Sequence, residues 1–143
     1  MQAATKSVTS LSDDKPLSYG FFVFWSVAVW AVATLILRIW GQMFFIPESN
    51  LSMGASFLFS ALFLPPLVYV LFRWQKVQHD QRGEALIYLT IPSMLLDVVT
   101  TYFFAQLFPN LPTSAACAFG AWLLWGYAIM FITGACLPSR RST

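Results

Sequence analysis

The fold is decided by the stretch ALIYLTIPSMLLDVVTTYFFAQL, residues 85–107. Asp97 is its only charged side chain. The stretch is longer than the roughly 20 residues that an α-helix needs to cross the hydrocarbon core of a bilayer. Because backbone groups in lipid must be hydrogen-bonded within their own segment, the stretch is predicted to be a membrane-spanning helix.

Three further stretches of the same character surround this one, at residues 17–45, 51–72 and 113–137. The chain of 143 residues is 58% hydrophobic and 10% charged, with a mean hydropathy of +0.67. Soluble domains carry about a quarter charged residues. Short links make successive helices antiparallel neighbours. The sequence therefore predicts an all-α fold, a membrane-embedded antiparallel four-helix bundle.

The bundle is expected to occupy residues 17–137, between a loosely ordered cytoplasmic leader (1–16) and a cytoplasmic tail (138–143). A secretory signal peptide is the alternative for the first span, because Ala31-Val32-Ala33 resembles a cleavage site. The apolar stretch continues past that site, which favours a retained span. Ser49 or Asn50 is expected to cap the second helix, and Thr113 or Ser114 the fourth.

The positions of the basic residues predict the orientation of the bundle. Only Arg38 lies toward the far end of the first span. Because cytoplasmic loops are enriched in Lys and Arg, both termini are predicted to be cytoplasmic. The other seven of the eight basic residues lie in regions that four spans place on one face: Lys6, Lys15, Arg73, Lys76, Arg82, Arg140 and Arg141.

A polar stripe runs along the third span and is predicted to face the bundle interior. Thr90, Ser93, Asp97, Thr100 and Thr101 fall within roughly a 100° arc of a helix. A charge at the centre of a bilayer costs roughly 2.5–3.5 kcal/mol, so it usually has a partner or a function. One interpretation is hydrogen bonding between helices, which we favour. The alternative is a proton or cation site, or the lining of a substrate cavity.

The first span offers a partner for this stripe. Thr34, Arg38 and Gln42 follow one helix face at i, i+4 and i+8. Arg38 is expected to lie roughly 10 Å from the depth of Asp97, at 1.5 Å of rise per residue, and to lean toward it. An ion pair with Asp97 is one outcome. A side chain that extends to the outer interface is the other.

Prolines interrupt two of the spans. Pro65 and Pro66 are expected to kink the second helix, and Pro92 to free a carbonyl in the third. Such breaks mark substrate sites in transporters, although ordinary packing is the interpretation we favour. In the fourth span Trp122, Trp125 and Tyr127 fit bundle packing as well as a pigment or lipid site.

The absence of reactive groups narrows the function. Cys117 and Cys136 lie about 28 Å apart on one predicted helix, too far for a disulfide. The single histidine, His79, falls in the polar loop. No phosphate-binding, nucleophile or C-x-x-C motif occurs. We therefore expect no catalytic residue, no metal, no cofactor and no nucleic-acid partner.

Three motifs in the second half resemble a known family. They are PSMLLD at 92–97, FPNL at 108–111 and FGAWLLW at 119–125. They resemble an uncharacterised, domain-of-unknown-function family of small bacterial four-span membrane proteins, over roughly residues 85–137. Ser93 stands where the family pattern has glycine. The resemblance implies four helices and a bacterial inner membrane, and it carries no established activity.

These observations favour a small integral membrane protein without enzymatic activity. Packing residues are plentiful and reactive ones scarce, which is typical of an accessory or assembly subunit that binds other membrane proteins or copies of itself. A small transporter or proton- or cation-coupled carrier that uses Asp97 is the second hypothesis. A membrane enzyme is the third.

Overall fold

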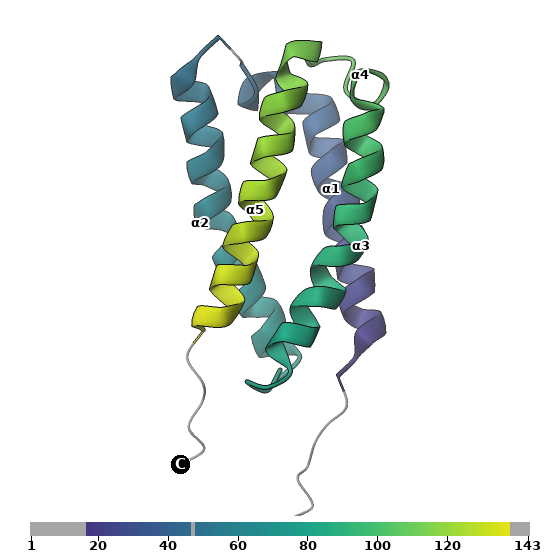
Figure 1. The fold of residues 1–143 in the computed structure, drawn as a ribbon, viewed down its shortest axis with the longest axis vertical. Coiled ribbons are helices and arrows are strands. Elements are labelled where there is room, and N and C mark those ends of the chain that lie inside the picture. The colour runs from purple at the N-terminus through teal and green to yellow at the C-terminus, as the bar shows by residue number, and fades with distance from the viewer. Residues whose placement is uncertain (1–16, 47, 138–143) are drawn as a thin grey trace, which may run out of the picture.

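The computed structural model describes residues 17–46 and 48–137 and shows a helical bundle (Figure 1). Four long helices run antiparallel: α1 (Tyr19–Phe44), α2 (Asn50–Trp74), α3 (Arg82–Tyr102) and α5 (Ala116–Cys136). A short helix α4 (Phe104–Leu107) and a 3₁₀ turn η1 (Thr113–Ala115) link α3 to α5. The described residues contain no strand, which confirms the predicted all-α bundle.

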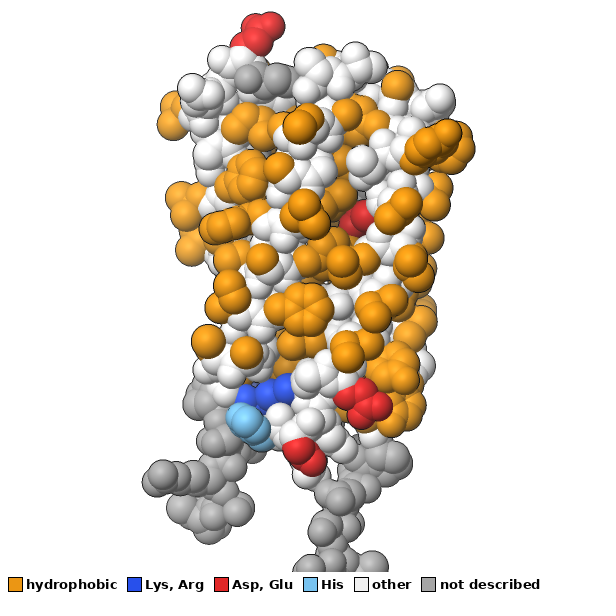
Figure 2. Space-filling view, in the orientation of Figure 1, with side chains coloured by type: hydrophobic (Ala, Val, Ile, Leu, Met, Phe, Trp, Pro, Cys, Tyr) orange, Lys and Arg blue, Asp and Glu red, His pale blue; other side chains and the backbone are white. Residues whose placement is uncertain are grey.

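Four helical segments are long and apolar enough to cross a membrane, as a multi-pass membrane protein requires. The fourth segment runs from Thr113 to Cys136 and includes η1. Hydrophobic side chains cover the middle of the bundle in Figure 2, and most charged ones lie near its ends. The predicted leader (1–16) and tail (138–143) lie outside the described residues.

The helices form a ring in which one seam is loose. α1 packs along α3, α3 along α5, and α5 along α2. α1 and α2 make fewer contacts with each other than any of these pairs, although a short turn connects them. The ring is therefore least tightly closed between α1 and α2.

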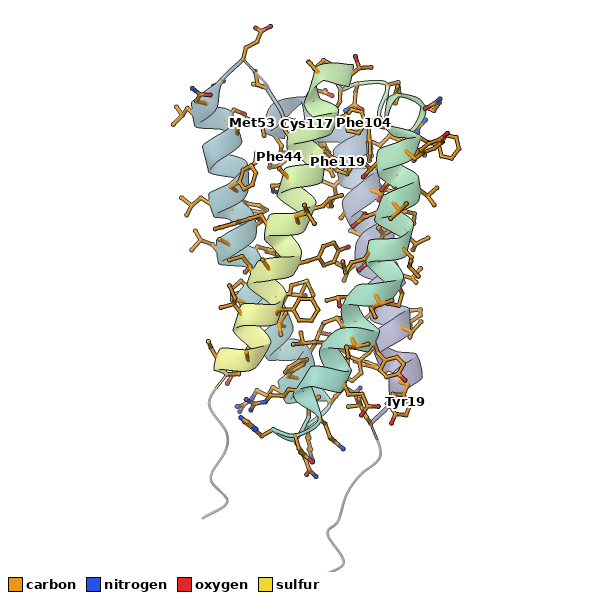
Figure 3. All side chains as sticks on the ribbon, in the orientation of Figure 1. Tyr19, Phe44, Met53, Phe104, Cys117 and Phe119 are labelled. Carbon is orange, nitrogen blue, oxygen red and sulfur yellow. The ribbon has the colours of Figure 1, made fainter. Side chains whose placement is uncertain are left out.

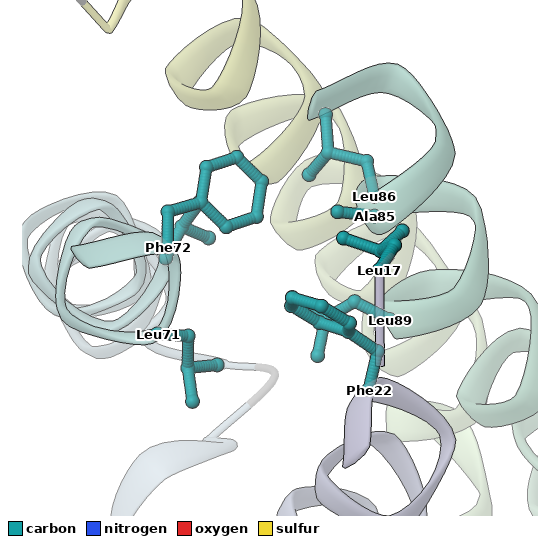
Figure 4. Close-up of a cluster of buried hydrophobic side chains, with 8 residues drawn as sticks. Leu17, Phe22, Leu71, Phe72, Ala85, Leu86 and Leu89 are labelled. Atoms are coloured by element: carbon teal, nitrogen blue, oxygen red, sulfur yellow. The ribbon is translucent and has the colours of Figure 1, made fainter. Parts of the chain in front are cut away.

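Two hydrophobic clusters fill the ends of the bundle. The lower cluster lies where α1 begins and α3 begins, and Figure 4 shows Phe22, Phe72 and Leu86 pointing toward one another there. The upper cluster surrounds the link from α3 to α5, where Figure 3 labels Phe104 and Phe119. The lower cluster comprises Leu17, Phe22, Val68, Leu71, Phe72, Ala85, Leu86 and Leu89. The upper cluster comprises Leu37, Phe45, Phe104, Phe108, Leu111, Ala115 and Phe119.

The third span differs from the predicted continuous stretch 85–107. α3 begins earlier, at Arg82, and ends at Tyr102. Phe103 leaves the helical conformation, with φ −97° and ψ 29°, before α4 begins. This break turns Phe104 and Phe108 inward, where both are buried in the upper cluster. Burial of the two rings explains why the helix does not continue.

The predicted helix starts are half right. The Ser49 hydroxyl accepts a hydrogen bond from the Ser52 backbone N–H at 3.3 Å, which confirms Ser49 as the cap of α2. The prediction of Thr113 or Ser114 as the cap of the fourth helix is wrong. Both residues lie inside η1, and α5 follows Ala115 without a side-chain cap. The 3₁₀ turn takes the place that the cap would have filled.

Candidate functional site

A cavity of ≈ 420 Å³ lies inside the bundle between the two clusters. All four long helices line it, mainly with apolar side chains. Among the described residues that line it, Asp97 is the only charged one. The other polar groups on the wall include hydroxyl and indole groups from all four helices: Ser26, Trp30, Ser56, Ser93, Trp122 and Tyr127.

Asp97 is half-buried on α3 and is held by α5. Its carboxylate accepts a hydrogen bond from the Tyr127 hydroxyl. The Thr100 hydroxyl lies 3.4 Å from Asp97 Oδ1, but it is closer to the Asp97 carbonyl oxygen, at 3.0 Å. A carboxylate can accept about four hydrogen bonds. Because the Tyr127 hydroxyl is the one strong donor to Asp97, the carboxylate can accept a further hydrogen bond.

Trp30 brings α1 to the same carboxylate. Its indole N–H lies near the Asp97 carboxylate, and both residues line the cavity. The nitrogen is buried and completes no hydrogen bond with any of residues 17–46 and 48–137. A buried indole N–H usually has a partner, and the Asp97 carboxylate is a suitable acceptor beside it.

The polar stripe on α3 faces inward for four of its five members. Thr90 and Thr100 are buried, and Ser93 and Asp97 are half-buried. Thr101 contradicts the prediction, because it is exposed on the outer side of α3. At 100° per residue, Thr101 lies at the edge of the arc, and α5 does not cover that edge.

Two hydrogen bonds join the stripe to other helices. Besides the Tyr127–Asp97 bond, the Ser93 backbone N–H donates to Ser26 Oγ of α1 at 3.1 Å. Thr90 Oγ1 donates to the Leu86 carbonyl at 2.8 Å, and the Ser93 and Thr100 hydroxyls also donate to carbonyls within α3. Pro92 lies inside α3 beside this bridge. The stripe therefore both connects helices and lines a cavity.

Arg38 does not pair with Asp97 in this structure. Its Nη1 donates to the Leu107 carbonyl oxygen at 2.8 Å, at the exposed end of the bundle. Gln42 lies at the same end and accepts a hydrogen bond from Asn110 Nδ2 at 2.8 Å. Of the three polar residues on this face of α1, only Thr34 lines the cavity. Of the two alternatives for Arg38, the structure has the side chain that extends toward the end of the bundle, not the ion pair with Asp97.

The prolines of α2 stand beside the cavity and are not on its wall. α2 stays helical across Pro65 and Pro66. Their neighbours Leu64 and Leu67 line the cavity. From α5, the indole nitrogens of Trp122 and Trp125 donate to backbone carbonyls of α2 (Ser56 and Phe57), each at 3.1 Å. Both indoles therefore attach α5 to the upper half of α2.

A second, outer groove reaches Asp97 from the opposite side. It runs between α3 and α5 on the outside of the bundle, where Gly120 leaves space and Thr101 is exposed. Asp97, Leu123 and Tyr127 line both the groove and the inner cavity. These three side chains form the wall between the two spaces.

Tyr127 and Trp30 were not identified from the sequence as neighbours of Asp97. The available signal was the need of a buried tyrosine hydroxyl for a partner. Asp97 is the only charged group within the apolar part of the third and fourth spans. Within the part of the chain that the structure describes, no three His, Cys, Asp or Glu residues gather closely enough to hold a metal ion.

The sequence model of a family of unknown function (DUF5367) matches residues 44–141. The matched region contains α2, α3 and α5, so it is wider than the stretch 85–137 in which the three motifs lie. No curated protein and no solved structure matches the chain.

Proposed function

The chain belongs to the DUF5367 family of unknown function, and we propose that it binds a small lipophilic molecule between its four helices, as a carrier within the membrane. One observation supports this proposal above the others. The ≈ 420 Å³ cavity is mainly apolar and has one carboxylate on its wall. Sites for small molecules are typically apolar hollows of about 300–1,000 Å³ with a few convergent polar groups.

The position of Asp97 supports a functional site over a purely structural one. A residue that only joined helices would be enclosed by its partners, whereas this carboxylate faces open space on both sides of the α3–α5 wall. Ionisable residues inside membrane helices usually mark ligand or ion pathways. Asp97 would bind the polar part of the ligand.

The accessory-subunit hypothesis rests on the scarcity of reactive groups. No contact among the described residues favours it over the cavity, so it takes second place. Co-purification in mild detergent tests it. A larger partner in fixed stoichiometry, together with no ligand binding, would support that hypothesis and contradict the carrier.

We place this carrier in a bacterial inner membrane with both termini in the cytoplasm. The described basic residues Arg73, Lys76 and Arg82 lie in or beside the link from α2 to α3, at the end where α1 begins and α5 ends (Figure 1). The positive-inside rule makes that end cytoplasmic. The bilayer is the expected partner, and self-association would extend the small enclosed volume of a single bundle.

Binding of a neutral lipophilic fluorophore, N-phenyl-1-naphthylamine, to the chain in lipid nanodiscs tests the proposal. Saturable binding is expected for the unmodified protein. Ala33→Phe fills the cavity wall and should weaken binding by about tenfold, which corresponds to ~1.4 kcal/mol. Ala128→Phe adds the same ring on the exposed side of α5 and serves as the control. Equal binding by all three proteins would contradict a ligand site in this cavity.

A further inference from the structure

The ends of the cavity are closed to water. The lower cluster fills the end where α1 begins, with Phe22 fully buried. The upper cluster fills the other end, with Phe108 fully buried and Phe119 nearly so. Close-packed aromatic and aliphatic side chains exclude water. A ligand that arrives along the bundle axis would have to displace one of these clusters.

The side of the cavity between α1 and α2 is open. Ile36, Phe59 and Phe63 line the cavity, yet they are 40%, 54% and 55% exposed. Phe59 and Phe63 stack with their ring centroids 5.8 Å apart, and Phe44 lies 6.2 Å from Phe59. This is also the seam with the fewest contacts between neighbouring helices. In a bilayer the seam faces hydrocarbon, so the cavity communicates with lipid.

The charge on the cavity wall has one sign. Asp97 is the only charged residue among the described residues of the wall, and Arg38 bonds the Leu107 carbonyl elsewhere. An ionised carboxylate in an apolar space is stabilised by an opposite charge. The described residues supply no such charge at the cavity. A bound cation would provide it, whereas a bound anion would be repelled.

The wall also carries aromatic side chains. Trp30, Trp122 and Tyr127 line the cavity, and Phe59 and Phe63 continue the aromatic surface to the seam. Aromatic faces attract cations, with tryptophan the strongest, and they also pack against apolar groups. The same surface therefore suits both halves of an amphiphilic cation.

We infer that the ligand is an amphiphilic monocation that reaches the cavity from the lipid between α1 and α2, with its charge beside Asp97 and its apolar body along Phe59 and Phe63. This inference rests on the proposed function and specifies the substrate class of the same site. It excludes hydrophilic cations, because no aqueous opening leads to Asp97 past the two clusters.

Competition against N-phenyl-1-naphthylamine in nanodiscs of zwitterionic lipid tests the ligand class. Tetraphenylphosphonium and tetraphenylborate have nearly the same shape and opposite charges. The phosphonium is expected to displace the neutral probe and the borate to fail. Tetramethylammonium, which carries the charge without an apolar body, should also fail. Displacement of the probe by the borate at a lower concentration than by the phosphonium would overturn the inference. Displacement by tetramethylammonium at the same concentration as by the phosphonium would also overturn it.

Asp97→Asn should lower the ratio of phosphonium to neutral-probe affinity by on the order of tenfold, because it removes the single negative charge. Asp80→Asn makes the same change of net charge in the exposed loop and should keep the wild-type ratio. An unchanged ratio in Asp97→Asn would overturn the inference. If the unmodified protein binds the neutral probe saturably but does not prefer the phosphonium, the proposed function stands and the inference about ligand charge fails. If the unmodified protein does not bind the probe at all, both the proposed function and the inference are contradicted.

Discussion

At the scale of single residues, the hydrogen bond from Tyr127 to Asp97 is the link that joins α5 to α3 inside the bundle. Tyr127→Phe removes the hydroxyl and keeps the ring. Hydrogen bonds between membrane helices contribute about 0.6 kcal/mol on average and up to about 1.7 kcal/mol. We expect a loss of that order in the free energy of unfolding, measured in detergent. A variant as stable as the wild type would show that the bond contributes nothing to folding.

Two substitutions of Asp97 distinguish its contribution to stability from its contribution to ligand binding. Asp97→Asn keeps an oxygen that accepts from Tyr127, so we expect a folded yield close to that of the wild type. Asp97→Leu leaves the Tyr127 hydroxyl without an acceptor, which costs about 1–3 kcal/mol. Yield and melting temperature of the two purified variants measure this. Equal stability of both would contradict a structural role for the carboxylate.

The sequence identified Asp97 as the central residue, because carboxylates are rare within apolar membrane-spanning helices. It did not identify the partner. Arg38 had the complementary charge and a suitable helix face, but its guanidinium extends to the Leu107 carbonyl at the bundle end. The partner of Asp97 depends on which side chains the packed helices bring together. Tyr127 is uncharged, so nothing in a single sequence indicates that it pairs with Asp97.

At the scale of helices, α5 packs closely against α3 at Gly134. A Cβ atom there would lie 2.4 Å from Leu86 Cδ1 and 3.0 Å from Leu86 Cγ. Leu86 belongs to the lower cluster and has little room to move. Gly134→Ala is therefore expected to destabilise the bundle by about 1–3 kcal/mol through overpacking.

Gly120 offers the matched control on the same helix. A Cβ atom at Gly120 would meet nothing within 4 Å. Gly120→Ala should stabilise α5 by up to about 1 kcal/mol through helix propensity. Thermal unfolding of both variants tests the contrast. If Gly134→Ala were the more stable of the two, the close contact between α3 and α5 would be contradicted.

The helices were predictable in their apolar centres and less so at their ends. Length and hydropathy located all four long helices within a few residues, because the cost of unpaired backbone in lipid dominates there. Where α3 ends, packing of Phe104 and Phe108 outweighs the local preference for helix. At η1 the same holds, since the backbone turn replaces a capping side chain.

At the scale of the whole molecule, the two clusters and the loose seam define a path from the lipid into the cavity. Water is excluded at both ends, while the interior meets the surroundings through the α1–α2 side. The cavity was the main feature that the sequence did not predict. Its volume depends on how far the four helices separate between the two packed ends. The sequence of a single span does not predict that separation.

The last prediction concerns the orientation of the bundle. Arg73, Lys76 and Arg82 lie at the end where α1 begins, so Gln78 in the loop between α2 and α3 should be cytoplasmic. Ser114, which is exposed in η1 at the opposite end, should face the outside. Cys117 and Cys136 are free thiols and must first be replaced by serine.

In that background, Gln78→Cys and Ser114→Cys place one thiol at each end. A membrane-impermeant maleimide should label Ser114→Cys on intact spheroplasts, and label Gln78→Cys only after permeabilisation. The reverse pattern would contradict the orientation and leave four spans intact. Labelling of both sites from outside would contradict the four-span topology itself, because α3 lies between the two sites and a single crossing must place them on opposite faces of the membrane.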